Sequence, residues 1–205
     1  MNITWYGNSC FGIETRERGE EAKSMVFFPN DKTSRSHAME ERAAIIVTSA
    51  KSSAKAKDDV SAFLIDGPGE YELAGFIIYA IPIASLGKFS AAVKVFAENM
   101  RLLWLPTLPS KVFSEKEIDQ LGEIDILLLP LNQEKGEKYL PAPAEETVKL
   151  MNEIEPRITI PFAREEKTVK SFLDEAGVKN VQPLEKFSVK QKDLSEETQI
   201  VQLKV

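Results

Sequence analysis

Short apolar segments separated by charged or glycine-containing turns fill the first half of the chain. They are rich in β-branched and aromatic residues, which favour extended backbone. The pattern predicts strands in NITWYG, CFGIET, SMVFF, AAIIVTS, AFLIDG and GFIIYAIPIA. We interpret RERGEEAK (residues 16–23) as an exposed loop between two strands and GPGEY (residues 67–71) as a tight hairpin. These strands are expected to form one sheet region.

The second half alternates between strand and helix patterns. FSAAVKVFAENMRLLWLP predicts a hairpin with its turn at AENM, and Ser114 can cap a helix in SEKEIDQL. IDILLLPL is a continuous apolar run typical of a strand buried on both faces. APAEETVKLMNEIE and REEKTVKSFLDEAG have helical spacing, the second ending at Gly177, with the strand RITIPF between them. The tail is expected to form a closing hairpin of FSVKQKDL and TQIVQLKV.

This order of elements predicts the fold class. Antiparallel strands followed by alternating strands and helices favour an α+β protein whose mixed sheets carry helices on their outer faces. Residues 1–205 contain no segment with the composition of a linker, so we predict a single domain. The pattern by itself indicates no chemistry.

Composition excludes several classes of function. Hydrophobic residues make up 43% and charged residues 28%, as in ordinary globular proteins, and the net charge of -6 opposes binding to nucleic acid. No segment approaches the roughly 20 apolar residues of a membrane span. Cys10 is the only cysteine and His37 the only histidine, so neither an internal disulfide nor a histidine-built zinc site is expected. We predict a cytoplasmic protein without a cofactor.

Four segments, in order, resemble one family over nearly the whole chain. They are ITWYGNSCFGIE, IDGPGEYELAG, FSEKEIDQLGEIDILLLPL and IEPRITIPF. They are similar to metallo-β-lactamase-fold hydrolases, in particular the branch of ascorbate-6-phosphate lactonase. The resemblance implies a four-layer αββα sandwich with a metal site at one edge between the two sheets.

The positions that match the family's metal ligands carry other residues. The family motif Thr/Ser-His-x-His-x-Asp-His falls on TSAKSSA, residues 48–54. The bridging aspartate falls at Leu108 or its neighbour Thr107. The late histidine falls at Ala163, an Asp-Pro pair at Phe28-Pro29, and a histidine of the first loop at Asn8. The positions of this vestigial site are therefore Asn8, Phe28, Ser49, Lys51, Ser53, Ala54, Leu108 and Ala163.

Replacement at separated positions suggests that the whole site has been released from metal binding. The four apolar replacements could fill the former cavity. We therefore predict a pseudoenzyme, with no catalytic and no metal-binding residue, that is retained as a binding or assembly module. Its partner would be a second copy or another protein, and no small-molecule ligand can be named.

Two alternatives remain open. A hydrolase could act through a non-standard site near Lys51 with Ser49 or Ser53, or through ligands that the comparison of motifs does not reveal. A nucleic-acid-associated function, as in nuclease members of the fold, would need a basic groove that the charge balance disfavours. We interpret Lys51 and His37 as solvent-facing side chains and Cys10 as a buried structural thiol. GPGEY precedes a strand and does not fit a phosphate-binding loop.

Overall fold

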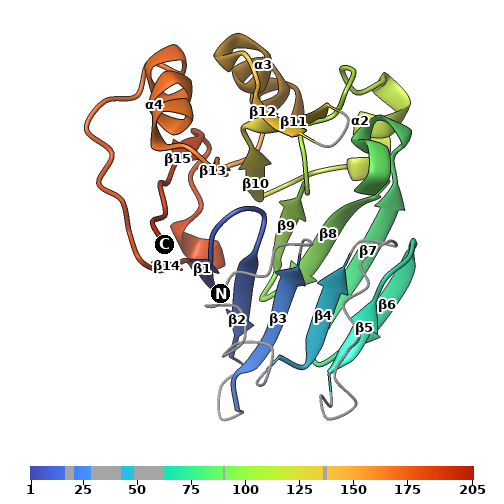
Figure 1. Cartoon of the computed structure of the whole chain (residues 1–205). Coiled ribbons are helices and arrows are strands. Elements are labelled where there is room, and N and C mark those ends of the chain that lie inside the picture. Colours follow the sequence, from blue (N-terminus) through green and yellow to red (C-terminus); the bar gives the residue numbers. More distant parts are fainter. Residues whose placement is uncertain (17–20, 29–42, 49–61, 90, 136–137) are drawn as a thin grey trace.

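The computed structural model describes residues 1–16, 21–28, 43–48, 62–89, 91–135 and 138–205. In these segments two mixed sheets face each other, with helices outside one of them (Figure 1). The first is a six-stranded sheet in the order β14 (Phe187–Ser188), β1 (Asn2–Trp5), β2 (Phe11–Thr15), β3 (Lys23–Phe28), β4 (Ile45–Thr48) and β5 (Phe63–Ile65). Strands β1 to β3 are antiparallel, whereas β3, β4 and β5 run parallel.

The second sheet has seven strands and repeats that plan. Its order is β15 (Gln199–Ile200), β13 (Ile158–Phe162), β10 (Ile126–Pro130), β9 (Met100–Trp104), β8 (Ala91–Ala97), β7 (Phe76–Pro82) and β6 (Gly69–Leu73). Strands β6 to β9 form an antiparallel meander, and β9, β10, β13 and β15 run parallel. A separate ribbon consists of β11 (Asn132–Lys135) and β12 (Lys138–Pro141). The parallel strands give the sheet distinct amino and carboxyl edges.

Four helices pack on the outer face of the seven-stranded sheet: η1 (Ala84–Phe89), α2 (Glu115–Leu121), α3 (Ala144–Ile154) and α4 (Glu166–Glu175). The short η2 (Gln191–Asp193), near the C-terminus, lies beside the amino ends of the parallel strands. Ser114 caps α2 as predicted, because its side chain accepts from the backbone of Glu117 while the Glu117 carboxylate accepts from the backbone of Ser114. Gly177 follows α4 with a positive φ, as a helix end requires.

Two apolar layers hold the fold together. The larger lies between the sheets and includes Phe27 and Ile45 from the first sheet and Leu102 and Ile126 from the second. The smaller lies between the seven-stranded sheet and the helices. Each fully buried large side chain contributes roughly 1.5–3 kcal/mol. The predicted α+β sandwich of two facing sheets is confirmed, and its helical cover is seen over the seven-stranded sheet but not, among the described residues, over the six-stranded one.

The predicted division of strands between the sheets is wrong in one place. GPGEY is no hairpin: the chain passes there from β5 in the first sheet to β6 in the second. The hairpin turn lies farther on, at Ala74 and Gly75, which both have positive φ. The β6–β7 pair therefore belongs to the second sheet, where β7 pairs with β8. The sequence pattern does not determine this, because the apolar face of the hairpin could cover the core from either sheet.

The predicted closing hairpin of the tail is also wrong. Strand β14 pairs with β1 in the six-stranded sheet, and β15 pairs in parallel with β13 in the seven-stranded sheet (Figure 1). Two-residue strands are too short to carry a hydrophobic pattern, so the open sheet edges determine their partners. The C-terminal segment thus connects the edges of both sheets.

None of the helices in the described segments combines the length and the apolar composition that crossing a membrane requires.

Candidate functional site

The two sheets meet tightly at the carboxyl ends of β3, β9 and β13, where the family resemblance places the metal site. Trp104 at the end of β9 stacks on Phe27 of β3, with ring centroids 4.8 Å apart and planes at 11°. Phe162 at the end of β13 meets Phe11 edge-on at 5.0 Å. Such aromatic pairs add roughly 0.5–1.5 kcal/mol beyond the area they bury. The side chains that lie between the sheets at this edge are therefore apolar and closely packed.

Leu108, predicted from the family resemblance to stand at the position of the bridging aspartate, is buried in the loop after β9. Its side chain is only 5% exposed and belongs to the apolar cluster under the helices. Its backbone N–H donates to the carbonyl of Asn132 at 3.0 Å, and the hydroxyl of Thr107 donates to the same carbonyl at 3.4 Å. Both alternatives for this position are thus enclosed and bonded to the chain after β10.

Ala163, predicted from the same resemblance to stand at the position of the late histidine, follows β13 and belongs to the same apolar cluster as Leu108. It is 4% exposed. The next residue, Arg164, donates its backbone N–H to the Asn132 side-chain oxygen at 3.1 Å and places its guanidinium over the Tyr139 ring at 4.6 Å. Two of the predicted positions, Leu108 and Ala163, are therefore brought together, with Asn132 bonded to both loops.

Sequence reasoning missed Asn132. The available signal was a polar residue directly after the apolar run that ends at Leu131, because side chains at the carboxyl ends of parallel strands converge on one edge. Its backbone carbonyl and side-chain oxygen accept hydrogen bonds from two different loops. Asn132 thus organises this edge.

Asn8 lies in the loop between β1 and β2, which two tryptophans fasten to the same edge. The Asn8 carbonyl accepts from the Trp5 indole at 2.7 Å, and the Ser9 carbonyl accepts from the Trp104 indole at 3.1 Å. The Ser9 hydroxyl donates to the carbonyl of Pro106 at 2.9 Å. Asn8 has a φ of +50°, a conformation that asparagine tolerates better than most residues.

Of the remaining predicted positions, only Phe28 lies within the described residues. Phe28 ends β3, where its backbone pairs with Thr48 at the end of β4. The positions that follow β4 lie outside the described residues: Ser49, Lys51, Ser53 and Ala54. His37 also lies outside them. Among the described residues, β3 and β4 end at the same edge as β9, since Phe27 of β3 stacks on Trp104.

Cys10 is buried on the outer side of the six-stranded sheet. It forms a small apolar cluster with Val26 and Ala43, against which Tyr6 packs. Burial raises the pKa of the Tyr6 hydroxyl group, so the phenol stays neutral. The interpretation of Cys10 as a buried residue is confirmed.

The side chains at the matched positions do not fit a zinc site. Zinc is held in proteins by imidazole, thiolate and carboxylate groups, usually four of them. The eight positions offer an amide, two hydroxyls, an ammonium and apolar groups. Within the segments that the structure describes, no three His, Cys, Asp or Glu side chains are grouped so as to hold a metal ion.

Solved structures resemble this arrangement over most or all of the chain. A candidate zinc-dependent hydrolase of the metallo-β-lactamase superfamily from Thermotoga maritima is 20% identical, with both chains fully covered and a TM-score of 0.68. YhfI from Bacillus subtilis, a metallo-β-lactamase fold protein, is 8% identical over 99% of this chain and 96% of its own, with a TM-score of 0.59. Igni18, a metallo hydrolase from Ignicoccus hospitalis, is 14% identical over 92% and 99%, with a TM-score of 0.56. These identities show a common fold alone.

Sequence comparison gives the family. No curated protein sequence matches the chain significantly. The family model described as the β-lactamase superfamily domain matches residues 2–163, which include both sheets up to the end of β13 and the position after it. The chain therefore belongs to the β-lactamase superfamily.

Proposed function

We propose that this chain is a catalytically inactive member of the superfamily, related to the branch of ascorbate-6-phosphate lactonase, and that it serves as a binding or assembly module. The observation that carries the proposal is the chemistry of the matched ligand positions. They are Asn8, Phe28, Ser49, Lys51, Ser53, Ala54, Leu108 and Ala163, and none of them supplies an imidazole or a carboxylate. Without such ligands the chain cannot activate water on a metal in the manner of a zinc hydrolase.

The packing around Leu108 and Ala163 supports the proposal. Both side chains are buried in one apolar cluster with Leu131 and Phe172. A polar metal ligand at either position would be enclosed by apolar neighbours, and interiors packed at this density leave no room for an ion and its coordinating water. These two positions contribute to the core and not to an open cleft.

Exposed apolar side chains at the same edge support a binding role. Val112, in the loop after β9, is 61% exposed, and Leu140 of β12 is 40% exposed. Gln133 connects Leu140 to the predicted site, because its backbone bridges to Leu108 and pairs with Leu140. Exposed apolar side chains beside the predicted site are the kind of group that an interface with another protein or a second copy of the chain would bury.

Metal content and stability test the loss of the metal site together. We expect well under one equivalent of zinc, iron or manganese per purified chain, and no change of melting temperature with EDTA. A ligand that binds the folded state raises its stability by mass action, so a true metal protein would lose stability on chelation. Near-stoichiometric metal combined with a lower melting temperature in EDTA would refute the proposal.

Hydrolysis assays separate the pseudoenzyme from the alternative site near Lys51. We expect no turnover of lactone, phosphodiester or thioester substrates above background, with or without added zinc or manganese. Turnover that survives purification and disappears in Lys51→Ala, but not in the exposed-lysine control Lys170→Ala, would establish the alternative instead. A fold alone does not determine which of these outcomes holds.

The assembly role has its own measurement. Sedimentation velocity of the purified chain, alone and as Leu140→Lys, reports self-association at this edge. We expect a concentration-dependent dimer that the substitution weakens, while Phe96→Lys, which alters an exposed apolar residue beside the β8–β9 turn at the opposite edge, leaves it unchanged. A monomer at all concentrations would leave a second protein as the required partner.

A further inference from the structure

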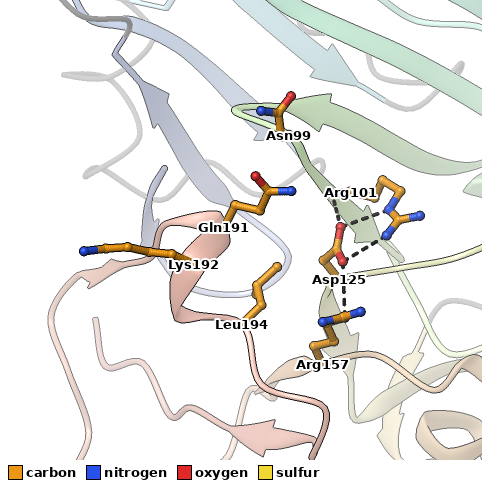
Figure 2. A pocket seen from close by; sticks show the side chains of 7 residues that line it. All are labelled: Asn99, Arg101, Asp125, Arg157, Gln191, Lys192 and Leu194. Carbon is orange, nitrogen blue, oxygen red and sulfur yellow. Dashed lines mark hydrogen bonds and ion pairs between the residues drawn. The ribbon is translucent and has the colours of Figure 1, made fainter.

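A pocket of about 350 Å³ lies at the opposite edge of the seven-stranded sheet from the vestigial site. Its walls come from the amino ends of three parallel strands and from η2 near the C-terminus (Figure 2). The lining residues are Asn99, Arg101, Asp125, Arg157, Gln191, Lys192 and Leu194. Three of these seven residues lie beyond residue 163, where the family match ends. This volume falls within the range of small-molecule sites, roughly 300–1,000 Å³.

Strand register places two arginines on either side of one aspartate. Ile126 of β10 pairs with Leu102 of β9 and with Ile158 of β13. The residues one position earlier are Arg101, Asp125 and Arg157, which therefore lie side by side across three strands. Backbone hydrogen bonds fix this row, from Asp125 N–H to the Arg101 carbonyl and from Ile158 N–H to the Asp125 carbonyl, both at 2.8 Å.

The Asp125 carboxylate is already satisfied within the protein. It is buried, and it accepts from the Arg101 backbone N–H at 2.7 Å, from Arg101 Nε at 2.9 Å and from Arg101 Nη2 at 3.1 Å. Arg157 Nε lies 3.7 Å from Asp125 Oδ1, the oxygen that also accepts from Arg101 Nη2. Hydrogen bonds with Asp125 and then with Glu123 raise the pKa of Arg101. Asp125 thus orients two permanently charged guanidinium groups and retains little capacity for a further cation.

Donors remain available around this pair. Within the described segments, the ion pair with Asp125 is the only interaction of the Arg157 guanidinium, whose side chain is 45% exposed. The Gln191 amide extends from η2 toward the arginine side of the pocket, and Asn99 stands at the turn between β8 and β9 (Figure 2). Lys192 lies farther out, on the rim. The lining thus carries three cationic side chains and one anionic side chain, in a chain whose net charge is -6.

We infer that this pocket binds a small molecule through an oxyanion, a phosphate or carboxylate group held by the Arg157 guanidinium, with Gln191 and Asn99 as neutral donors. The planar fork of a guanidinium matches the oxygens of either group. Leu194 supplies an apolar wall for the rest of the ligand. The site is independent of the proposed loss of the metal centre, because none of its residues belongs to the carboxyl edge.

A purely structural ion network is the competing explanation, and Arg157 separates the two. The hydrogen bonds between Arg101 and Asp125 hold the strand ends whether or not a ligand binds. Arg157, by contrast, makes only a long contact with Asp125. If its role were merely structural, its substitution would hardly change the stability or the affinity for anions. If it holds an anion, its substitution should weaken anion binding.

The experiment titrates the full-length, ¹⁵N-labelled chain with inorganic phosphate, and in a second arm with acetate, while two-dimensional amide spectra are recorded. Sodium chloride at matched ionic strength is the reference. We expect saturable shifts confined to amides around residues 99–101, 125–126, 157–158 and 191–194. Arg157→Gln should raise the Kd about tenfold, since a hydrogen bond to a charged group is worth about that factor. Lys170→Gln, which removes an exposed positive charge from α4, should leave the Kd unchanged.

Each outcome decides the inference. Saturable binding that Arg157→Gln weakens supports it, and the tighter of the two anions identifies the phosphate or the carboxylate as the recognised group. Gln191→Ala provides a second variant, with a smaller expected rise in Kd, should Arg157→Gln be poorly folded by its amide spectrum. Shifts no larger than those with chloride, or a Kd unaffected by both substitutions, would overturn the inference.

Discussion

Replacing Asp125 with alanine tests the ion network most directly. This side chain lies just before β10 and is 4% exposed. It accepts one backbone and two side-chain hydrogen bonds from Arg101 and lies within ion-pair distance of Arg157. The substitution removes all of these contacts at once. It also leaves the backbone N–H of Arg101 without its acceptor.

The expected loss of stability depends on how far the arginines left behind can be hydrated or paired with other groups. Breaking a buried pair by removing one partner costs about 3–5 kcal/mol, because the other charge is left uncompensated. The Arg101 side chain is 33% exposed and keeps its ion pair with Glu123, so part of its charge is hydrated after the change. We therefore expect Asp125→Ala to lower the free energy of unfolding by about 3 kcal/mol, at the low end of that range. Typical domains have only about 5–15 kcal/mol in total.

Urea unfolding, followed by tryptophan fluorescence, measures this change. The midpoint should fall while the slope with urea stays constant, which indicates a loss of stability without a change in the surface exposed on unfolding. Glu123→Gln is the matched control: its side chain is 81% exposed, and the loss should stay below about 1 kcal/mol. A loss below about 1 kcal/mol for Asp125→Ala as well would refute this account of the network.

Three further substitutions test other parts of the fold. Burial lowers the pKa of Lys94, so just below the ordinary lysine pKa the unfolded chain binds more protons than the folded one. The wild type should gain stability over Lys94→Met as the pH rises from about 8 to about 10 in urea melts; a constant difference would contradict this. Ser114→Ala removes the cap of α2 and should cost about 1 kcal/mol in the same assay. Trp104→Phe keeps a ring to stack on β3 but loses the 3.1 Å hydrogen bond to Ser9, and thermal melts followed by circular dichroism should show a loss of about 1 kcal/mol. An unchanged urea midpoint for Ser114→Ala, or an unchanged melting temperature for Trp104→Phe, would argue against the corresponding contact.

Local signals in the sequence predicted local structure well. The serine before α2, the continuous apolar run of β10 and the turn between β8 and β9 each depend on neighbouring residues, and the structure has all three. The turn residues Glu98 and Asn99 both have positive φ, as a tight two-residue hairpin requires. Periodicity and capping are short-range properties, so a single sequence contains them.

Pairing between distant segments could not be predicted in the same way. Arg101 and Arg157 flank Asp125 only because three strands align in one register, and each of them reads alone as an ordinary surface arginine. The crossing between sheets after β5 depends on which sheet has an open edge, which no local pattern encodes. The positions after β4 stay a prediction, since they lie outside the described residues.

The placement of β14 and β15 at the edges of different sheets affects the order in which a growing chain can be completed. Strand β1 begins at Asn2, yet its outer partner starts only at Phe187. At 5–20 residues per second, a ribosome would need roughly 10–40 s to supply that partner. Until then the outer backbone groups of β1 remain available for pairing with another chain. Strand β14, which is made long after β1, therefore protects β1 from pairing with the strands of other chains.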